Sequence, residues 1–147
     1  MYNSSHDFTF AIVKPNAVKA GNTGPILAMI NKAGFEITAM RMVKLTRAQA
    51  SSFYDIHRGE EFFIPLIDYM TSGPVVVMIL QHQTGNSVGR FRELMGPTDP
   101  SEAPEGTIRK LFAESPRMNA IHGADSKMNA EKESNFFFSG IERFYST

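Results

Sequence analysis

The stretch VVVMIL, residues 75–80, is the longest uninterrupted apolar run in the chain. A strand with one face in water alternates apolar and polar residues, so a run without alternation predicts a central strand covered on both faces. The run is far shorter than the ~20 residues that a membrane-spanning helix needs. It therefore predicts an internal strand of a sheet with packed layers on either side.

Three further strands are expected around this one. Residues 8–13 form the first candidate strand, and Pro15, which has no N–H to give to a ladder, stops it. Residues 35–45 alternate apolar and polar side chains, and residues 119–122 form a short candidate strand. The expected helices are 25–33, 46–58, 62–70, 88–95, 107–114 and 127–138, and the expected loops are 16–24 and 97–106. The order reduces to βαββαβ, which predicts an α/β (α+β), ferredoxin-like fold with a four-stranded antiparallel sheet covered by helices. We expect one domain over residues 1–147.

Composition narrows the class of protein. The chain has no formal net charge, which argues against a protein whose main partner is nucleic acid or an anionic membrane. It has no cysteine, which excludes a disulfide framework and thiolate chemistry. Residues 1–7 are polar and lack the pattern of a signal peptide. We expect a soluble, cytoplasmic protein.

The common phosphate- and metal-binding motifs are absent. The chain contains no G-x-x-x-x-G-K-[ST], no G-x-G-x-x-G and no H-E-x-x-H, and it has no Cys/His cluster. If this protein handles phosphate, it must use side chains in place of a glycine-rich loop.

The stretch NAIHGADS, residues 119–126, carries the clearest chemical signal. A neutral imidazole is a good nucleophile near pH 7, so His122 is a candidate nucleophile. We expect Gly123 to leave room for a bulky electrophile. Glu133 lies eleven residues later, about three helical turns, and could return to orient the ring. On these residues alone, a histidine that merely bonds a strand-end carbonyl is the favoured interpretation.

The pattern N-x-x-H-G-x-D-S, with Lys14-Pro15 ending the first strand, resembles the nucleoside diphosphate kinase family. Other blocks agree in order and spacing: FAIVKP at 10–15, FF at 62–63, SGPVV at 72–76, LMG at 94–96 and GTIR at 106–109. The resemblance extends over roughly residues 8–138. It implies transfer of the γ-phosphoryl group of a nucleoside triphosphate to a nucleoside diphosphate, which maintains nucleoside triphosphate pools. The implied mechanism is ping-pong, through a phosphohistidine at His122.

The resemblance also implies the roles of residues around His122. Lys14 would contact the γ-phosphate and the sugar 3′-hydroxyl, and Asn119 would also hold the sugar. Tyr54 would lie beside Lys14 and the phosphates. Glu133 would orient His122.

Further residues are implied as nucleotide contacts. Phe62 would stack on the base with Leu66 nearby, a contact that hardly distinguishes one base from another. The implied β- and γ-phosphate contacts are Arg92, Thr98 and Arg109. Mg²⁺ would enter with the nucleotide, and Asp125 would lie near the phosphates that carry it. The implied assembly is a homo-oligomer, a hexamer or a tetramer, with loop 97–106 as a contact element.

The sequence departs from the family pattern in three places. Ala124 stands where the family usually has Ser or Thr beside the active histidine. Residues 81–86 are about two residues longer than usual, and Pro116 stands where an apolar residue often covers the base.

Two other classes of protein remain as alternatives. A nucleic-acid-binding module could share this topology, but neither the charge nor an RNP1 motif supports it. A catalytically silent relative would lack His122 or Lys14, and both are present. Phe62 and Tyr54 could also be ordinary core aromatics, and Arg92 could belong to a solvated helix face. We expect His6, His57 and His82 to be surface residues.

Overall fold

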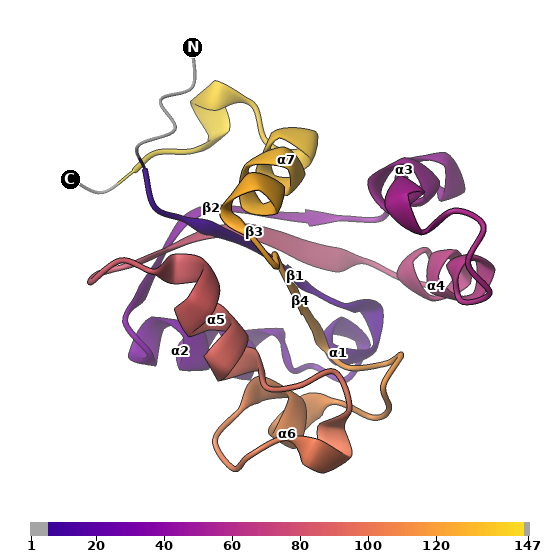
Figure 1. The fold of residues 1–147 in the computed structure, drawn as a ribbon, viewed down its shortest axis with the longest axis horizontal. Helices are drawn as coiled ribbons and strands as arrows, with labels where there is room; N and C mark the ends of the chain where they lie inside the picture. Colours follow the sequence, from indigo (N-terminus) through magenta and orange to yellow (C-terminus); the bar gives the residue numbers. More distant parts are fainter. Residues whose placement is uncertain (1–5, 146–147) are drawn as a thin grey trace.

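The computed structural model describes residues 6–145; residues 1–5, part of the polar N-terminus noted above, lie outside it. Four strands form one antiparallel sheet in the order β2-β3-β1-β4 (Figure 1). They are β1 (Thr9–Val13), β2 (Phe35–Val43), β3 (Val75–His82) and β4 (Ile121–Gly123). The order β2-β3-β1-β4 is the one that a βαββαβ topology produces, so the predicted ferredoxin-like fold is confirmed.

The two central strands are mostly apolar because both faces of the sheet are covered. Val75, Val77 and Ile79 of β3 pack in one apolar cluster, which also holds Phe10 and Ile12 of β1. The residues between them, 76, 78 and 80 in β3 and 11 and 13 in β1, pack in a second cluster. Successive side chains of a strand point to opposite faces, so each strand contributes side chains alternately to the two clusters.

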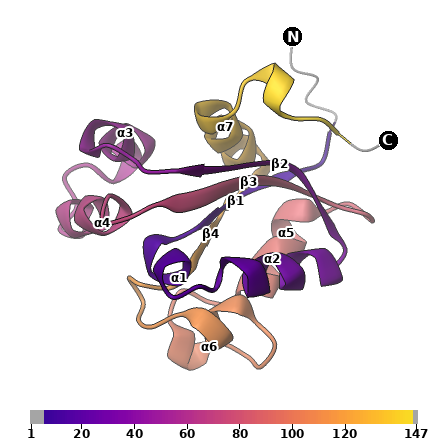
Figure 2. The same cartoon turned by 180° about the vertical axis from the view of Figure 1, so that it is seen from behind.

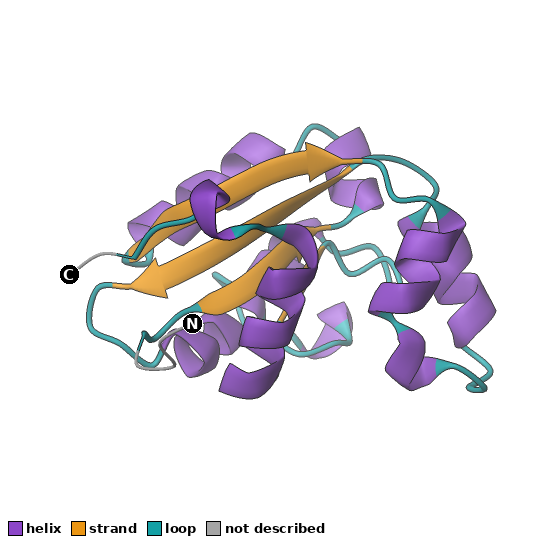
Figure 3. Cartoon of the chain, turned by 90° about the horizontal axis from the view of Figure 1, so that it is seen from above, coloured by secondary structure: helices purple, strands orange, loops and turns teal. Residues whose placement is uncertain are grey.

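Helices cover the two faces unequally (Figures 1 and 2). The helix α7 (Lys127–Phe137) lies on one face, and α2 (Thr23–Lys32), α5 (Ser87–Met95) and α6 (Ile108–Phe112) lie on the other. The remaining pair, α3 (Arg47–Phe53) and α4 (Phe63–Met70), forms a helical hairpin beyond one end of the sheet (Figure 3). The 3₁₀ turns are Asp55–His57, Pro100–Glu102 and Gly140–Glu142.

The structure differs from the predicted elements in several places, among them the start of α2 at Thr23 in place of Pro25. The expected loop 16–24 begins with a short helix, α1 (Pro15–Lys19), which opens on Pro15 and is too short to show a helical period. The helix predicted from the Thr46 capping box starts as expected but ends at Phe53, and a 3₁₀ turn follows. The last strand starts at Ile121, later than expected, because a tight turn precedes it.

The C-terminal segment closes against the outer strand β2. Arg41 of β2 donates a 2.9 Å hydrogen bond to the carbonyl of Phe137 and forms a 3.3 Å ion pair with Glu142. These contacts fix the C-terminal end of α7 on the sheet. Over residues 6–145, no helix is both long and apolar enough to cross a bilayer.

Candidate active site

His122 lies in β4 and faces α7. Its Nε2 is 2.7 Å from Oε1 of Glu133, and both side chains are only about one-fifth exposed (20% and 17%). The pair forms because Ser126 caps α7 immediately after β4, so the helix turns back over the sheet and brings Glu133 to the ring. The expectation that Glu133 returns to His122 therefore agrees with the structure.

Aromatic rings surround the His122 imidazole. The rings of Phe10, Phe53 and Tyr54 lie 6.1, 5.8 and 6.4 Å from it, each at a steep angle. These rings pack against the imidazole and leave it only partly exposed. Nothing in the sequence singled out Phe53, whose position against His122 depends on where the α3–α4 hairpin packs.

A strained turn precedes His122. The N–H of Ile121 donates a 2.9 Å hydrogen bond to the carbonyl of Asn119, and Ala120 between them has φ +74°. This is the rarer, strained form of the γ-turn, and a residue with a side chain adopts it at a cost of order 1–3 kcal/mol. The turn directs the Asn119 side chain toward Lys14.

Lys14 is a buried ammonium group at the end of β1. Its Nζ donates a 2.8 Å hydrogen bond to Oδ1 of Asn119, and its N–H donates to the carbonyl of Ala120. Burial, together with the charge of Arg109, lowers the pKa of Lys14 from 10.5 to about 7. The two residues that the sequence assigned to the sugar and the γ-phosphate thus lie in direct contact.

Arg109 is largely buried and forms a structural link. It donates 2.9 Å hydrogen bonds to the carbonyls of Gly96 and Ile121, which join the end of α5 to β4. Its Nε is buried without a partner among residues 6–145. Burial, with the nearby charge of Arg92, lowers its pKa to about 10. Lys14, Arg92 and Arg109 therefore form one electropositive region beside β4, suited to bind phosphate.

Tyr54, at the end of α3, is buried, with 6% of its surface exposed. Its hydroxyl is buried and has no hydrogen-bond partner in the described part of the chain. Burial first, and then the charges of Glu133 and Tyr69, raise its pKa, so the hydroxyl stays protonated. An unsatisfied buried donor next to His122 fits a ligand that supplies an acceptor oxygen.

The residues assigned to the base lie on the α3–α4 hairpin. Phe62 precedes α4 and is 44% exposed, with its ring 5.1 Å from that of His57. Leu66, one turn later, packs partly against the core. Phe62 is thus available for stacking and is not an ordinary core aromatic. His57 is half-buried against Phe62 and Tyr54, so the expectation of a plain surface histidine does not describe it.

Thr98 and Asp125 lie at the margin of this region. The Thr98 side chain is exposed, and its carbonyl accepts a 3.5 Å hydrogen bond from Asn119. Asp125 is exposed and accepts a hydrogen bond from Asn129 at 2.5 Å. Between residues 6 and 145, no three His, Cys, Asp or Glu side chains are grouped to hold a metal ion.

Gly123 has a different role from the one expected. A Cβ at this position would overlap Met95 and approach Phe91 within 2.9 Å, both on α5. The glycine therefore lets α5 pack closely on β4, on the face opposite His122, and provides no room for an electrophile. Ala124 is likewise buried, at 1% exposure, in the apolar cluster beneath α7.

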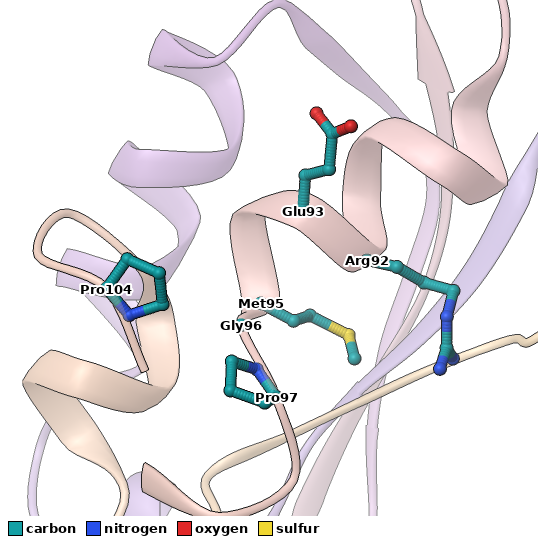
Figure 4. A pocket seen from close by; sticks show the side chains of 6 residues that line it. All are labelled: Arg92, Glu93, Met95, Gly96, Pro97 and Pro104. Atoms are coloured by element: carbon teal, nitrogen blue, oxygen red, sulfur yellow. The ribbon is translucent and has the colours of Figure 1, made fainter. Parts of the chain in front are cut away.

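A pocket of about 440 Å³ lies at the end of α5, lined by Arg92, Glu93, Met95, Gly96, Pro97 and Pro104 (Figure 4). Arg92 is the only predicted site residue that lines it. In Figure 4 the Arg92 guanidinium extends away from Pro97 and Pro104. Because His122 and Lys14 are not part of this pocket, we assign the chemistry to the polar region beside β4.

The chain resembles known proteins over nearly its whole length. The family model described as nucleoside diphosphate kinase matches residues 7–143. Nucleoside diphosphate kinases of Psychromonas ingrahamii and Lawsonia intracellularis are each 52% identical to it, over 91% and 92% of this chain and 92% and 96% of theirs.

Solved structures agree with the sequence comparison. The Aquifex aeolicus nucleoside diphosphate kinase superposes with a TM-score of 0.90 at 40% identity, covering 94% of this chain and 99% of that one. The Halobacterium salinarum enzyme, solved in complex with CDP, gives 0.89 at 31% identity, covering 97% and 94%. The chain belongs to the nucleoside diphosphate kinase family.

Proposed function

We propose that this chain transfers the γ-phosphoryl group of a nucleoside triphosphate to a nucleoside diphosphate through a phosphohistidine at His122. The observation that carries the proposal is the 2.7 Å contact between Nε2 of His122 and Glu133, next to the buried Lys14–Asn119 pair. A nucleophile, the group that orients it and a phosphate-binding cation are thereby brought together.

The contact with Glu133 supports Nδ1 as the reacting nitrogen. With the proton on Nε2 donated to the carboxylate, the lone pair of Nδ1 is free to attack the γ-phosphorus. The new N–P bond forms as the bond to the β–γ bridging oxygen breaks, and the nucleoside diphosphate leaves with that electron pair. Glu133 stabilises the positive charge that develops on the ring. A second nucleoside diphosphate then removes the phosphoryl group by the reverse steps.

Positioning and charge neutralisation are the main demands of phosphoryl transfer. Lys14, Arg92 and Arg109 supply positive charge, and Tyr54 supplies a protonated hydroxyl with no other partner in the described chain. Thr98 and Asn119 complete the proposed contacts with phosphate and sugar, and Phe62 with Leu66 would hold the base.

Mg²⁺ fits this site as a companion of the nucleotide. Mg²⁺ keeps several waters and binds through substrate phosphates with one or two carboxylates. Asp125 offers one exposed carboxylate, and it is the residue we propose to lie near the ion. When bound, Mg²⁺ would neutralise phosphate charge.

We further propose a single domain over residues 1–147 that acts as a cytoplasmic homo-oligomer, a hexamer or a tetramer. The outer strand β2 supports self-association, because Met40 and Met42 are 51% and 62% exposed on an edge that no other strand covers in the described sheet. Loop 97–106 is a second proposed contact element. Light scattering after size exclusion would distinguish a hexamer from a tetramer, and a monomer would contradict the proposal.

The test of function is labelling with γ-³²P-ATP and Mg²⁺ in the absence of an acceptor, with His122→Ala beside the wild type. We expect an acid-labile, base-stable label on the wild type that an added nucleoside diphosphate removes, and no label on the variant. A wild type that binds nucleotide but stays unlabelled would instead indicate a nucleotide sensor.

A further inference from the structure

Two buried polar side chains lie next to the site and have no role in the chemistry above. Asn16 is the second residue of α1 and Tyr69 lies near the end of α4; they are 8% and 9% exposed. The Tyr69 hydroxyl donates a hydrogen bond to Oδ1 of Asn16 and accepts one, at 3.4 Å, from the Asn16 N–H. Nδ2 of Asn16 donates at 3.2 Å to the carbonyl of Met118.

These contacts fix the Asn16 amide in one orientation. Its oxygen faces a donor and its nitrogen faces an acceptor, so rotation of the amide by half a turn would break both interactions. The hydroxyl of Tyr69 remains a donor, since burial raises the pKa of Tyr69 to about 12.

The orientation of Asn16 acts on the segment that precedes His122. Three hydrogen bonds join the end of β1 to this segment: Lys14 N–H to Ala120, Lys14 Nζ to Asn119, and Asn16 to Met118. The first two involve the proposed catalytic pair directly. The third holds Met118, the residue before Asn119, and is itself held by Tyr69 from a different element, α4.

We propose that Asn16 and Tyr69 are positioning residues for phosphoryl transfer, which hold Asn119 and Lys14 in place through the carbonyl of Met118. The role rests on the proposed function. The strained turn at Ala120 needs such support, because a conformation that costs energy persists only where neighbouring contacts impose it. Small displacements of a positioning group lower the rate far more than they lower ground-state binding.

The test compares Tyr69→Phe with Thr71→Val. Both changes remove one hydroxyl that forms a hydrogen bond at the end of α4, but Thr71 donates to Ile67 within its own helix, at 2.8 Å. We expect Tyr69→Phe to lower kcat about 2- to 12-fold, the equivalent of one neutral hydrogen bond, with the Kd for nucleoside diphosphate changed less than about 2-fold. Thr71→Val should leave kcat at the wild-type value.

A second variant reports on the same link. Asn16→Ala should lower kcat at least as much as Tyr69→Phe, and the double variant should be no slower than Asn16→Ala alone, because the two residues act through one contact. Asn16→Ala also serves as the test if Tyr69→Phe does not fold.

Three outcomes would overturn the proposal. Equal kcat in Tyr69→Phe and Thr71→Val would show that the hydroxyl of Tyr69 is structural only. Losses that add in the double variant would show that the residues act separately. A wild type that ATP does not phosphorylate would overturn the proposed function, and the positioning role with it.

Discussion

The ammonium of Lys14 is held by the side-chain amide of Asn119, 105 positions away in the chain, at 2.8 Å. The amide is polar but neutral, and none of the ion pairs within residues 6–145 includes Lys14. The protein thus buries a cation without a counter-ion, which is costly unless the group loses its proton. This is the arrangement expected of a site whose counter-ion is the substrate.

The first prediction is that Lys14→Met stabilises the fold at pH 6 while it abolishes transfer. The pKa of Lys14 is about 7 in the folded protein and 10.5 as a free side chain. Below pH 7 the Lys14 side chain is charged in both the folded and the unfolded protein, so folding carries the full cost of burying that charge. As pH rises from about 7 to 10.5 the folded state releases its proton first, so the wild type gains stability.

The advantage of Lys14→Met over the wild type should therefore shrink between pH 6 and pH 9, as measured by urea unfolding. Lys19→Met, at the exposed end of α1, the helix that directly follows Lys14, is the matched control and should show no such trend. A stability advantage of Lys14→Met that grows with pH would contradict the lowered pKa of Lys14.

The second prediction concerns the partner of His122. Glu133→Gln keeps the size of the side chain but removes the charge that stabilises the imidazolium. A hydrogen bond to a charged group contributes about 1.5–3 kcal/mol, so kcat should fall about 10- to 150-fold. Glu131→Gln, on the same helix, should retain wild-type kcat. An unchanged rate of phosphoenzyme formation in Glu133→Gln would remove Glu133 from the mechanism.

The third prediction tests the base-binding end. Phe62→Ala removes an exposed ring whose loss should cost about 1–3 kcal/mol of stacking, which corresponds to a roughly 5- to 150-fold weaker Kd for ADP. The rate at saturation should change little, because His122 and Lys14 are untouched. Ile64→Ala, at a residue of α4 that is 56% exposed and two positions after Phe62, should bind ADP normally. Equal Kd values in the two variants would place the base elsewhere.

The fourth prediction follows from the packing of α5 on β4. Gly123→Ala forces a methyl group against Met95 and Phe91, and such overpacking typically costs about 1–3 kcal/mol of stability. Gly140→Ala adds the same methyl group where no atom lies within 4 Å, so its unfolding midpoint should match the wild type. If Gly123→Ala unfolds like the wild type and only its activity falls, the glycine serves the reaction after all.

The fifth prediction concerns the missing hydroxyl beside His122. Ala124→Ser restores the residue type usual in the family, and one neutral hydrogen bond is equivalent to about a 2- to 12-fold increase in turnover. Steady-state kinetics with ATP and a nucleoside diphosphate acceptor would measure it. No gain would show that the hydroxyl is dispensable in this chain.

Much of the fold was predictable because apolar patterns define it. The continuous run 75–80 required a strand covered on both faces, and the structure places its side chains alternately in two clusters. The spacing of Glu133 from His122, about three helical turns, predicted the return of α7 to His122, because helical spacing depends only on local geometry.

What the sequence did not predict depends on long-range packing or on unfavourable local conformation. Ala120 gives no sign that it adopts a positive φ, since glycine and asparagine are the residues typical of that conformation. The contact of Asn16 with Tyr69 joins positions 53 apart, and no sequence motif indicates it. Gly123 was misinterpreted because the residues that surround it, on α5, lie far away in the sequence.

The position of the α3–α4 hairpin has a consequence for how substrate and protein influence each other. The hairpin, which carries Phe62 and Tyr54, lies beyond the end of the sheet (Figure 1), whereas Lys14 directly follows β1 and His122 lies in the outer strand β4. A nucleotide that contacts both pairs of residues would hold the hairpin in place against the sheet. The amide protons of the hairpin should therefore exchange much more slowly in the complex than in the free protein. The bound substrate would then stabilise the position of the hairpin, and the hairpin would become more mobile each time a product dissociates.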